Sequence, residues 1–305
     1  MGRAVRIIGA PTDFGSNRRG VDMGPSAIRY AGLIEGIEST GADCTDVGDV
    51  RVPHVRRHGG DREDPVPNAK HLDQIAEVST RIADEVADAR EEGALPIVVG
   101  GDHSLAIGTV AGAARDADLG LLWFDAHGDY NTPETSPSGN VHGMPLAASL
   151  GRGAFADMDW ARADGLREKN VVWVGLRSLD DAEREAIREG DATAYTMADI
   201  DERGINDLVE EALEVATSGV DGLHVSLDLD WLDPRIAPGV GTPVRGGVTY
   251  REAHSAMETV ADWDRATGDL HSFEVVEVNP ILDSHNETAE LATELTASAV
   301  GKRVL

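Results

Sequence analysis

Short apolar segments alternate with longer amphipathic ones along most of this sequence, and this alternation constrains the fold more than any other feature. The short segments are β-branched or leucine-rich and are flanked by Gly, Pro or Asp, which is typical of buried strands. The longer segments carry apolar residues at helical spacing. Strands that alternate with helices form βα units, a parallel sheet and right-handed crossovers. We therefore expect an α/β protein.

The predicted strands are Val5–Gly9, Pro96–Gly100, Gly120–Phe124, Val171–Gly175, Gly222–Asp230 and Ser272–Val278. The predicted helices are Leu72–Glu92, Leu105–Asp116, Asp180–Gly190, Ile205–Ser218 and Thr249–Ala266. The last helix has a capping-box sequence, because Glu252 is placed to reach back to Thr249. No repeat, low-complexity block or long linker divides the chain, so we expect one domain over residues 1–305.

Length and cysteine content narrow the class of protein. The chain has 305 residues, 41% of them hydrophobic, which is enough for a full core. The lone cysteine, Cys44, cannot form an internal disulfide, as expected in a reducing compartment. The apolar stretch at the N-terminus is too short for a signal peptide, and no later run reaches membrane length. We therefore expect a soluble cytoplasmic protein.

The charge balance is unusual, with 55 acidic and 27 basic residues and a formal net charge of −28. Such a surface repels nucleic acids and anionic lipids, so we expect neither as a partner. Only Lys70, Lys169 and Lys302 are lysines. The acidity either keeps the protein soluble in a salt-rich cytoplasm or attracts a cationic substrate. We favour the first interpretation, since net charge affects solubility before function.

Acidic residues and histidines gather where three predicted strands end. The segments are Gly101-Asp102-His103-Ser104, Asp125-Ala126-His127-Gly128-Asp129 and Asp228-Leu229-Asp230. In parallel sheets, ligands bind outside the carboxyl ends of the strands. Because side chains two apart on a strand share a face, we expect the aspartates of each segment to converge, together with His127. These polar groups should form one site.

So many buried carboxylates need compensating positive charge, since burying an unpaired charge costs several kcal/mol. Two divalent cations would neutralise four aspartates, and His103 and His127 would add nitrogen ligands. Oxygen-rich sites with imidazole suit Mn²⁺. Two such ions can share a hydroxide whose pKa they lower toward neutrality. A lone Asp-x-Asp is usually a turn or a cap, and a lone histidine on a strand is usually part of the core, but three groups of Asp and His residues at strand ends indicate a dinuclear-metal hydrolase.

These three motifs resemble those of the ureohydrolase family, whose members include arginase and agmatinase. The resemblance extends from Arg19-Gly20-Val21-Asp22-Met23-Gly24-Pro25 to Glu277-Val278-Asn279-Pro280. It implies a three-layer α/β/α fold with a mostly parallel eight-stranded sheet, two Mn²⁺ per chain, and a homo-oligomer of three or six chains. It also implies that His103 and Asp129 bind one metal, that His127 and Asp230 bind the other, and that Asp125 and Asp228 bridge both.

The segment from Asn131 to Gly143 discriminates between substrates. It resembles the arginase loop, in which a serine and an asparagine hold the α-carboxylate of the amino acid. By this resemblance Ser138 and Asn140 take those roles, with Asn131 nearby. Agmatine has no α-carboxylate, so an agmatinase does not need this arrangement. The resemblance therefore implies hydrolysis of L-arginine to L-ornithine and urea.

A second stretch, Gly175–Glu183, also resembles arginase. The resemblance implies that Asp180 and Glu183 hold the α-ammonium of the substrate, directly or through water. The alternative is that both acids only stabilise a helix N-terminus, where negative charge is favourable.

Guanidinium hydrolysis requires a strong nucleophile, a partner for the cation and an acid for the leaving amine. The family match places Glu277 opposite the guanidinium as a charge-assisted partner. Asp129 accepts a hydrogen bond from the nucleophile, and Thr242 lines the guanidinium pocket. His142 is the expected proton shuttle, because an unperturbed imidazole titrates near neutrality.

One residue departs from the family pattern. After Asp230 the family often has glycine, whereas this chain has Trp231, which would alter packing or narrow the entrance. The alternatives to arginase are agmatinase or another guanidino-acid hydrolase, and a one-metal, deacetylase-like amide hydrolase. A non-catalytic protein fits poorly, because none of the metal or proton-transfer positions is missing.

Overall fold

A single eight-stranded sheet forms the centre of the structure, a computed structural model that describes residues 3–53 and 66–303. Every neighbouring pair of strands is parallel, and the strand order is β2-β1-β3-β8-β7-β4-β5-β6. The strands are β1 (Ala4–Ala10), β2 (Asp43–Asp49), β3 (Leu95–Gly100), β4 (Leu119–Phe124), β5 (Leu166–Leu176), β6 (Thr193–Thr196), β7 (Gly222–Asp228) and β8 (Leu270–Val276).

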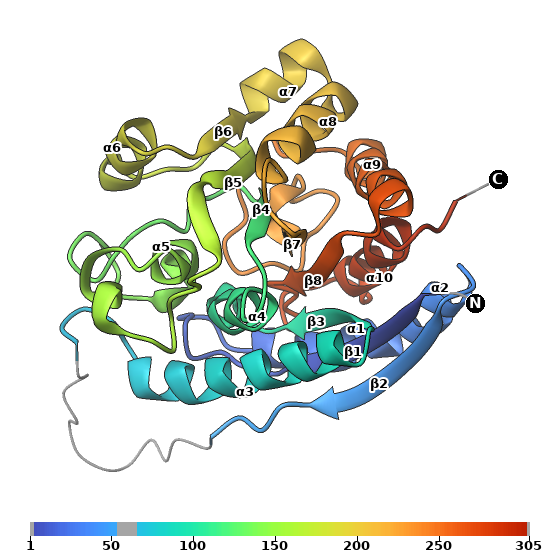
Figure 1. The fold of residues 1–305 in the computed structure, drawn as a ribbon, viewed down its shortest axis with the longest axis horizontal. Helices are drawn as coiled ribbons and strands as arrows, with labels where there is room; N and C mark the ends of the chain where they lie inside the picture. The colour runs from blue at the N-terminus through green and yellow to red at the C-terminus, as the bar shows by residue number, and fades with distance from the viewer. Residues whose placement is uncertain (1–2, 54–65, 304–305) are drawn as a thin grey trace.

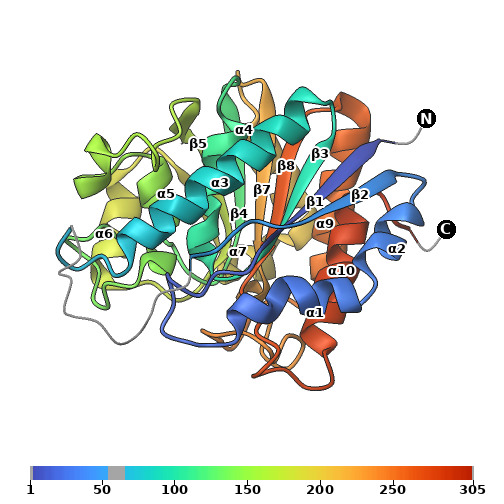
Figure 2. The same ribbon diagram turned by 90° about the horizontal axis from the view of Figure 1, so that it is seen from below.

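Helices cover both faces of this sheet (Figures 1 and 2). Helices α3 (Leu72–Glu91), α4 (Ala106–Ala113) and α5 (Pro145–Ser149) pack on one face. The opposite face is covered by α1 (Gly24–Tyr30), α2 (Leu33–Glu38), α8 (Ile205–Ala216), α9 (Tyr250–Thr267) and α10 (Glu287–Ala299). Helices α6 (Asp181–Glu189) and α7 (Met197–Arg203) lie near β6. The predicted three-layer α/β/α fold is confirmed, and the sheet is parallel throughout.

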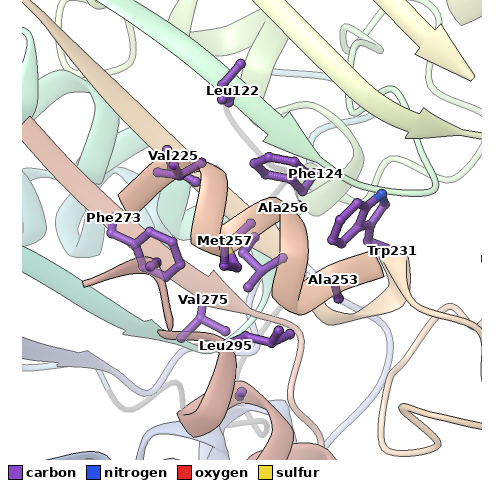
Figure 3. Close-up of a cluster of buried hydrophobic side chains, with 14 of the residues drawn as sticks. Leu122, Phe124, Val225, Trp231, Ala253, Ala256, Met257, Phe273, Val275 and Leu295 are labelled. Carbon is purple, nitrogen blue, oxygen red and sulfur yellow. The ribbon is translucent and has the colours of Figure 1, made fainter. Parts of the chain in front are cut away.

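Alternating side chains on the central strands fill two separate cores. On β4, Leu122 and Phe124 pack toward α9, whereas Leu121 and Trp123 pack toward α3 and α4. Figure 3 shows the first of these cores, where Phe124 and Phe273 from the sheet meet Met257 of α9. Because both faces are covered, β3 and β4 are buried along their whole length, as expected for a parallel sheet, whereas β7 and β8 also bury polar residues, among them His224 and Glu274.

The sequence predicted the six central strands but neither edge strand. Strand β2 alternates between exposed and half-buried residues and contains three aspartates, and β6 has only four residues. The short helices α1, α2, α5 and α7 and the C-terminal α10 were also missed. Two strands end earlier than predicted, β7 at Asp228 and β8 at Val276. The capping box of Thr249 and Glu252 is confirmed.

The strand order brings together the carboxyl ends of the four strands that carry the candidate site residues. Strands β3, β8, β7 and β4 are neighbours at the middle of the sheet, although they are far apart in sequence. Their carboxyl ends deliver His103, Glu277, Asp228 and Asp125 to the same edge. Among the described residues, no helix is both long and apolar enough to cross a bilayer.

Candidate metal centre and substrate pocket

His103 stands at the centre of a group of carboxylates. Its Nδ1 lies 3.0 Å from an oxygen of Asp129, 3.1 Å from one of Asp228 and 3.3 Å from one of Asp125. The histidine and Asp125 are each 1% exposed. The Nδ1 atom makes no hydrogen bond with the described residues. A buried nitrogen that faces three carboxylates without a hydrogen bond is arranged to bind a cation.

A second group adjoins the first and shares Asp125. The Nδ1 of His127 lies 3.0 Å from Asp230 Oδ2 and 3.4 Å from Asp125 Oδ1. His103, Asp125 and Asp129 form one set with metal-ligand spacing, and Asp125, His127 and Asp230 form another. Asp125 uses a different oxygen toward each histidine, Oδ2 toward His103 and Oδ1 toward His127. Its carboxylate is therefore placed to touch two ions at once.

Asp228 belongs to the same cluster but differs from Asp125. One of its oxygens faces His103, and the other accepts a hydrogen bond of 2.7 Å from the backbone N–H of Asp230. Asp228 thus faces the first group directly and supports the second through Asp230. The structure places all six predicted ligands together: His103, Asp125, His127, Asp129, Asp228 and Asp230.

The electrostatics of the cluster require added positive charge. Burial, reinforced by the charge of Asp125, raises the pKa of Asp129 to about 6. Burial and the nearby Asp230 raise the pKa of Asp228 well above its usual value. Burial lowers the pKa of His103, but the carboxylates around it outweigh burial and raise that pKa well above its ordinary value. A cluster of buried carboxylates with these shifts favours added positive charge, which divalent metals would supply.

The backbone brings these ligands together by turns more than by strand alternation. We expected strand alternation to bring Asp125, His127 and Asp129 together, but β4 ends at Phe124, as predicted, so all three follow the strand, and Asp129 has a φ of 49°. Asp230 lies in a 3₁₀ turn, Leu229–Trp231, directly after β7. The strand-based reason for their convergence was therefore wrong. The apolar strands end first, and irregular backbone then turns each side chain inward.

Two further residues support the ligands and were missed by the sequence analysis. Trp123 stacks on the His103 ring at 4.3 Å and donates its indole N–H to Asp125 Oδ2 at 3.0 Å. Ser226 Oγ lies 2.8 Å from Nε2 of His103. Each precedes a ligand by two positions: Ser226 and Asp228 share a face of β7, whereas Asp125 follows the end of β4, so strand periodicity contained a signal for Ser226 alone. Such contacts orient a metal-binding imidazole and hold its ligating nitrogen toward the ion.

A pocket opens directly above the cluster. Five of the predicted ligands reach it, whereas Asp125 lies beneath them. The predicted residues Asn131, Ser138, His142, Glu183 and Thr242 also line it, and so do Ser136, Pro137 and Gly143, which were not predicted. The predicted residues Asn140, Asp180 and Glu277 are not part of this lining. Thr242 donates a hydrogen bond of 2.8 Å to Asp230 Oδ2, so it connects the pocket wall to the metal end.

The N-terminus of α6 forms one side of the pocket. Asp180 is the N-cap residue and forms a capping box with Glu183. The second oxygen of Asp180 accepts a hydrogen bond of 2.7 Å from Asn131 Nδ2. Burial and then the charge of Asp129 raise the pKa of Glu183 to about 7. The capping role does not exclude a substrate role, because Glu183 also lines the pocket.

Glu277 and His142 form a pair beside the metal ligands. Glu277 Oε1 accepts a hydrogen bond of 3.0 Å from the backbone of His103 and lies 3.2 Å from His142 Nδ1. Glu277 follows β8 rather than ending it, with a φ of 64°. Burial lowers the pKa of His142, but the hydrogen bond and charge of Glu277 outweigh it and raise that pKa to about 9. This shift favours the protonated imidazole at neutral pH, and the role of His142 as proton shuttle stays a prediction.

Trp231 does not narrow the entrance. Its side chain is fully buried and packs on Phe124 with ring centroids 4.9 Å apart, in the core beneath α9 (Figure 3). The indole occupies the space in front of Gly175, where an added Cβ would lie 2.1 Å from Trp231 Nε1. Trp231 therefore fills the core, while its neighbour Asp230 faces the pocket.

Comparison with known proteins agrees with this geometry. Residues 3–301 match the model of the Arginase family. The chain is 48% identical to the arginase of Bacillus subtilis, an alignment that covers all of both chains. The solved structure of Bacillus caldovelox arginase superposes with a TM-score of 0.92 at 46% identity, over all of both chains. That of Entamoeba histolytica arginase, solved in complex with L-ornithine, superposes with a TM-score of 0.87 at 30% identity, over 99% of this chain and all of that one. This chain belongs to the arginase family.

Proposed function

We propose that this protein is an arginase, which hydrolyses L-arginine to L-ornithine and urea. One observation carries the proposal: a single pocket has a cluster of histidines and carboxylates at its base and, around it, both the Ser138 loop and the Glu183 carboxylate. The histidines and carboxylates at the bottom of the pocket suit hydrolysis of a guanidinium. The loop and the acid suit the α-carboxylate and α-ammonium of an amino acid.

The metal centre that we propose contains two Mn²⁺ ions per chain. His103 and Asp129 would bind one, His127 and Asp230 the other, and Asp125 and Asp228 would bridge them. The unpartnered Nδ1 of His103 and the oxygen-rich donor set fit such ions. When bound, they neutralise the carboxylates and lower the pKa of a shared water, which supplies the nucleophile for the guanidinium carbon.

The protein's own residues would orient the substrate and move protons. Glu277 would pair with the guanidinium by charge-assisted hydrogen bonds, next to His142. Asp129 would accept a proton from the attacking water, as its contact with His103 places it at the metal end. His142, held protonated by Glu277, would donate a proton to the departing amine of ornithine. Thr242 would hold Asp230 against the guanidinium end of the pocket.

At the other end of the pocket, Ser138 and Asn140 would hold the α-carboxylate, with Asn131 beside them. Glu183 would bind the α-ammonium, and Asp180 would position both Glu183 and Asn131 through its two oxygens. The whole chain, residues 1–305, would act as one catalytic domain in the cytoplasm, as a trimer or a hexamer. We attribute the net charge of −28 to a salt-rich cytoplasm.

The decisive experiment measures urea release from L-arginine, agmatine and guanidinobutyrate by the purified protein with Mn²⁺. We expect arginine to be the preferred substrate by a wide margin. Preference for agmatine or guanidinobutyrate would replace the proposal with the corresponding hydrolase. Metal analysis should find two Mn²⁺ per chain, and one per chain would contradict the dinuclear site. Light scattering would determine the number of chains in the oligomer.

A further inference from the structure

The substrate loop ends in two side chains that are prepared to donate hydrogen bonds. Ser138 Oγ accepts a hydrogen bond of 3.1 Å from the backbone N–H of Asn140, so its own hydroxyl hydrogen is left to donate elsewhere. Asn140 lies between Ser138 and His142, which both line the pocket. Asn140 is buried, at 6% exposed, and its Nδ2 makes no hydrogen bond with the described residues, so this group keeps its capacity to donate. Both side chains therefore present donors, which suits an anion.

Lys70 determines which way the Asn140 amide faces. Its Nζ donates a hydrogen bond of 3.0 Å to Asn140 Oδ1. An ammonium has three donors and no acceptor, so it can pair with the carbonyl of the amide but never with its NH₂ group. Rotation of the amide by half a turn would bring two donors together. Lys70 thus holds the side-chain carbonyl of Asn140 toward its own ammonium and leaves the NH₂ group of Asn140 free to donate.

The segment that contains Lys70 also holds the backbone of the loop. Lys70 N donates to Gly139 O at 2.9 Å, and Asn68 Nδ2 donates to the carbonyls of Pro133 at 2.9 Å and Ser136 at 2.8 Å. Gly139 has a φ of 70°, and a Cβ there would lie 2.7 Å from Asn68 Oδ1. The loop is therefore shaped to accept this segment closely.

Core packing keeps the segment in place. Ala69 and Leu72 are 1% and 3% exposed, and both pack in one apolar cluster with Val141 of the loop. Lys70 is half-buried between these anchors. Its position is thus set by the start of α3, which is independent of the strands that carry the metal ligands.

Lys70 also places positive charge at the correct end of the pocket. The metal end contains Asp129, Asp228 and Asp230, and Glu183 lies on the α6 side. An α-amino acid with a basic side chain carries its only negative charge on the α-carboxylate. An ammonium behind Asn140 complements that carboxylate, whereas it offers nothing to an amine that lacks one.

We propose that Lys70 is a specificity-determining residue: by holding the Asn140 side-chain carbonyl and adding positive charge behind it, it establishes the preference for substrates with an α-carboxylate. The inference rests on the proposed arginase function. Lys70 does not line the pocket and bonds to Asn140, so it acts through Asn140 as a positioning residue.

The test compares Lys70→Met with the wild-type protein, both loaded with Mn²⁺. Lys70→Met keeps the length of the side chain and removes the ammonium. We expect the KM for L-arginine to rise about 10-fold or more, the scale of one hydrogen bond to a charged group, while kcat changes less than about twofold. The KM for agmatine should stay within about twofold. Lys70→Arg, which keeps a cation with donors only, should retain most of the preference.

Binding measurements provide a readout that does not depend on turnover. Calorimetry should show that Lys70→Met weakens L-ornithine about 10-fold or more and leaves putrescine, which lacks the carboxylate, unchanged. Lys169→Met is the matched control, because Lys169 is exposed on β5, and it should alter neither ligand. If Lys70→Met does not fold, Lys70→Gln tests the same point, since an amide no longer dictates the orientation of Asn140.

The outcomes separate this inference from the proposed function. A wild-type protein that neither hydrolyses arginine nor binds ornithine would overturn the proposed function. A wild-type protein active on arginine, combined with an unchanged ornithine affinity in the Lys70 variants, would overturn only the role of Lys70. Equal weakening of ornithine and putrescine would also overturn it, because Lys70 would then support the loop without discriminating between ligands.

Discussion

The two ends of the pocket are built in different ways. The metal end uses residues that directly follow four neighbouring strands at the centre of the sheet, and its ligands include Asp125 and His103, each 1% exposed. The substrate end uses the loop around Ser138 and Asn140, which is held by two hydrogen bonds from Asn68 and two from Lys70. The residues proposed for catalysis are thus positioned by the sheet, whereas the residues proposed for substrate selection are positioned by contacts between loops. Mutations should therefore separate catalysis from specificity.

The largest effect should come from Asp125, which faces both histidines. Asp125→Asn removes a carboxylate that both candidate metal groups share, so we expect loss of the metal pair and activity at the level of the metal-free protein. Elemental analysis of the dialysed variant gives the metal content. Two Mn²⁺ retained at full occupancy would refute the bridging role. Asp180→Asn, outside the cluster, is the control that should keep both metals.

His142 tests whether proton transfer separates from metal binding at the same end. His142→Asn should keep both metals and the KM for arginine, and should lower kcat by about 10²- to 10⁴-fold, the usual contribution of a general acid. Steady-state kinetics and metal analysis of one sample measure both quantities. An unchanged kcat would remove His142 from the mechanism.

At the substrate end, Asn140→Ala should change specificity without changing metal content. We expect the KM for arginine to rise about 10-fold or more, because a hydrogen bond to a carboxylate is lost, and the KM for agmatine to change little. Kinetics with the two substrates measure the difference. Equal effects on both would contradict the assignment of the α-carboxylate to this loop.

Acidic pH should weaken the substrate end through Glu183. Burial and the charge of Asp129 raise the pKa of Glu183 to about 7, so its carboxylate predominates above that pH and is protonated below it. The KM for arginine should therefore rise as the pH falls through 7, by about 10-fold per pH unit at the limit. In Glu183→Gln this dependence should disappear. A dependence that persists in the variant would assign the titration to another group.

The smallest expected effect is that of salt on the melting temperature, through the negative charge of the whole surface. With a net charge of −28, the chain repels itself in dilute buffer, and salt screens that repulsion. The melting temperature should rise by a few degrees between dilute buffer and molar KCl. A melting temperature that is flat or falling would count against adaptation to a salt-rich cytoplasm. Osmotically matched sucrose controls for effects other than charge.

The contrast between the metal end and the substrate end also explains which features of the structure the sequence could predict. The central strands and the clustered ligands carry strong local signals, namely apolar runs followed directly by Asp and His. The turn at Asp129 and the early ends of β7 and β8 had no such signal, because neighbouring backbone and not residue type determines where a strand stops. Nothing local marks Lys70 as a partner of Asn140, since 70 positions separate them. Contacts between distant loops follow from the fold and cannot be obtained from spacing.

Strand β2 has a consequence for how copies of the molecule avoid polymerising. It is an edge strand, and an exposed edge offers unpaired backbone groups to a second sheet. Asp46 and Asp49 pair with the Arg29 guanidinium, so the charge that opposes such pairing is mainly that of the exposed Asp43, and molar salt weakens this defence. Between Ile7 and Gly9 of β1 the pairing with β2 shifts register, and Gly48 there has a φ of 88°. A local distortion of this kind twists the edge strand away from a second sheet, whatever the ionic strength. In molar salt, which screens the charge repulsion, the distortion therefore still opposes edge-to-edge aggregation.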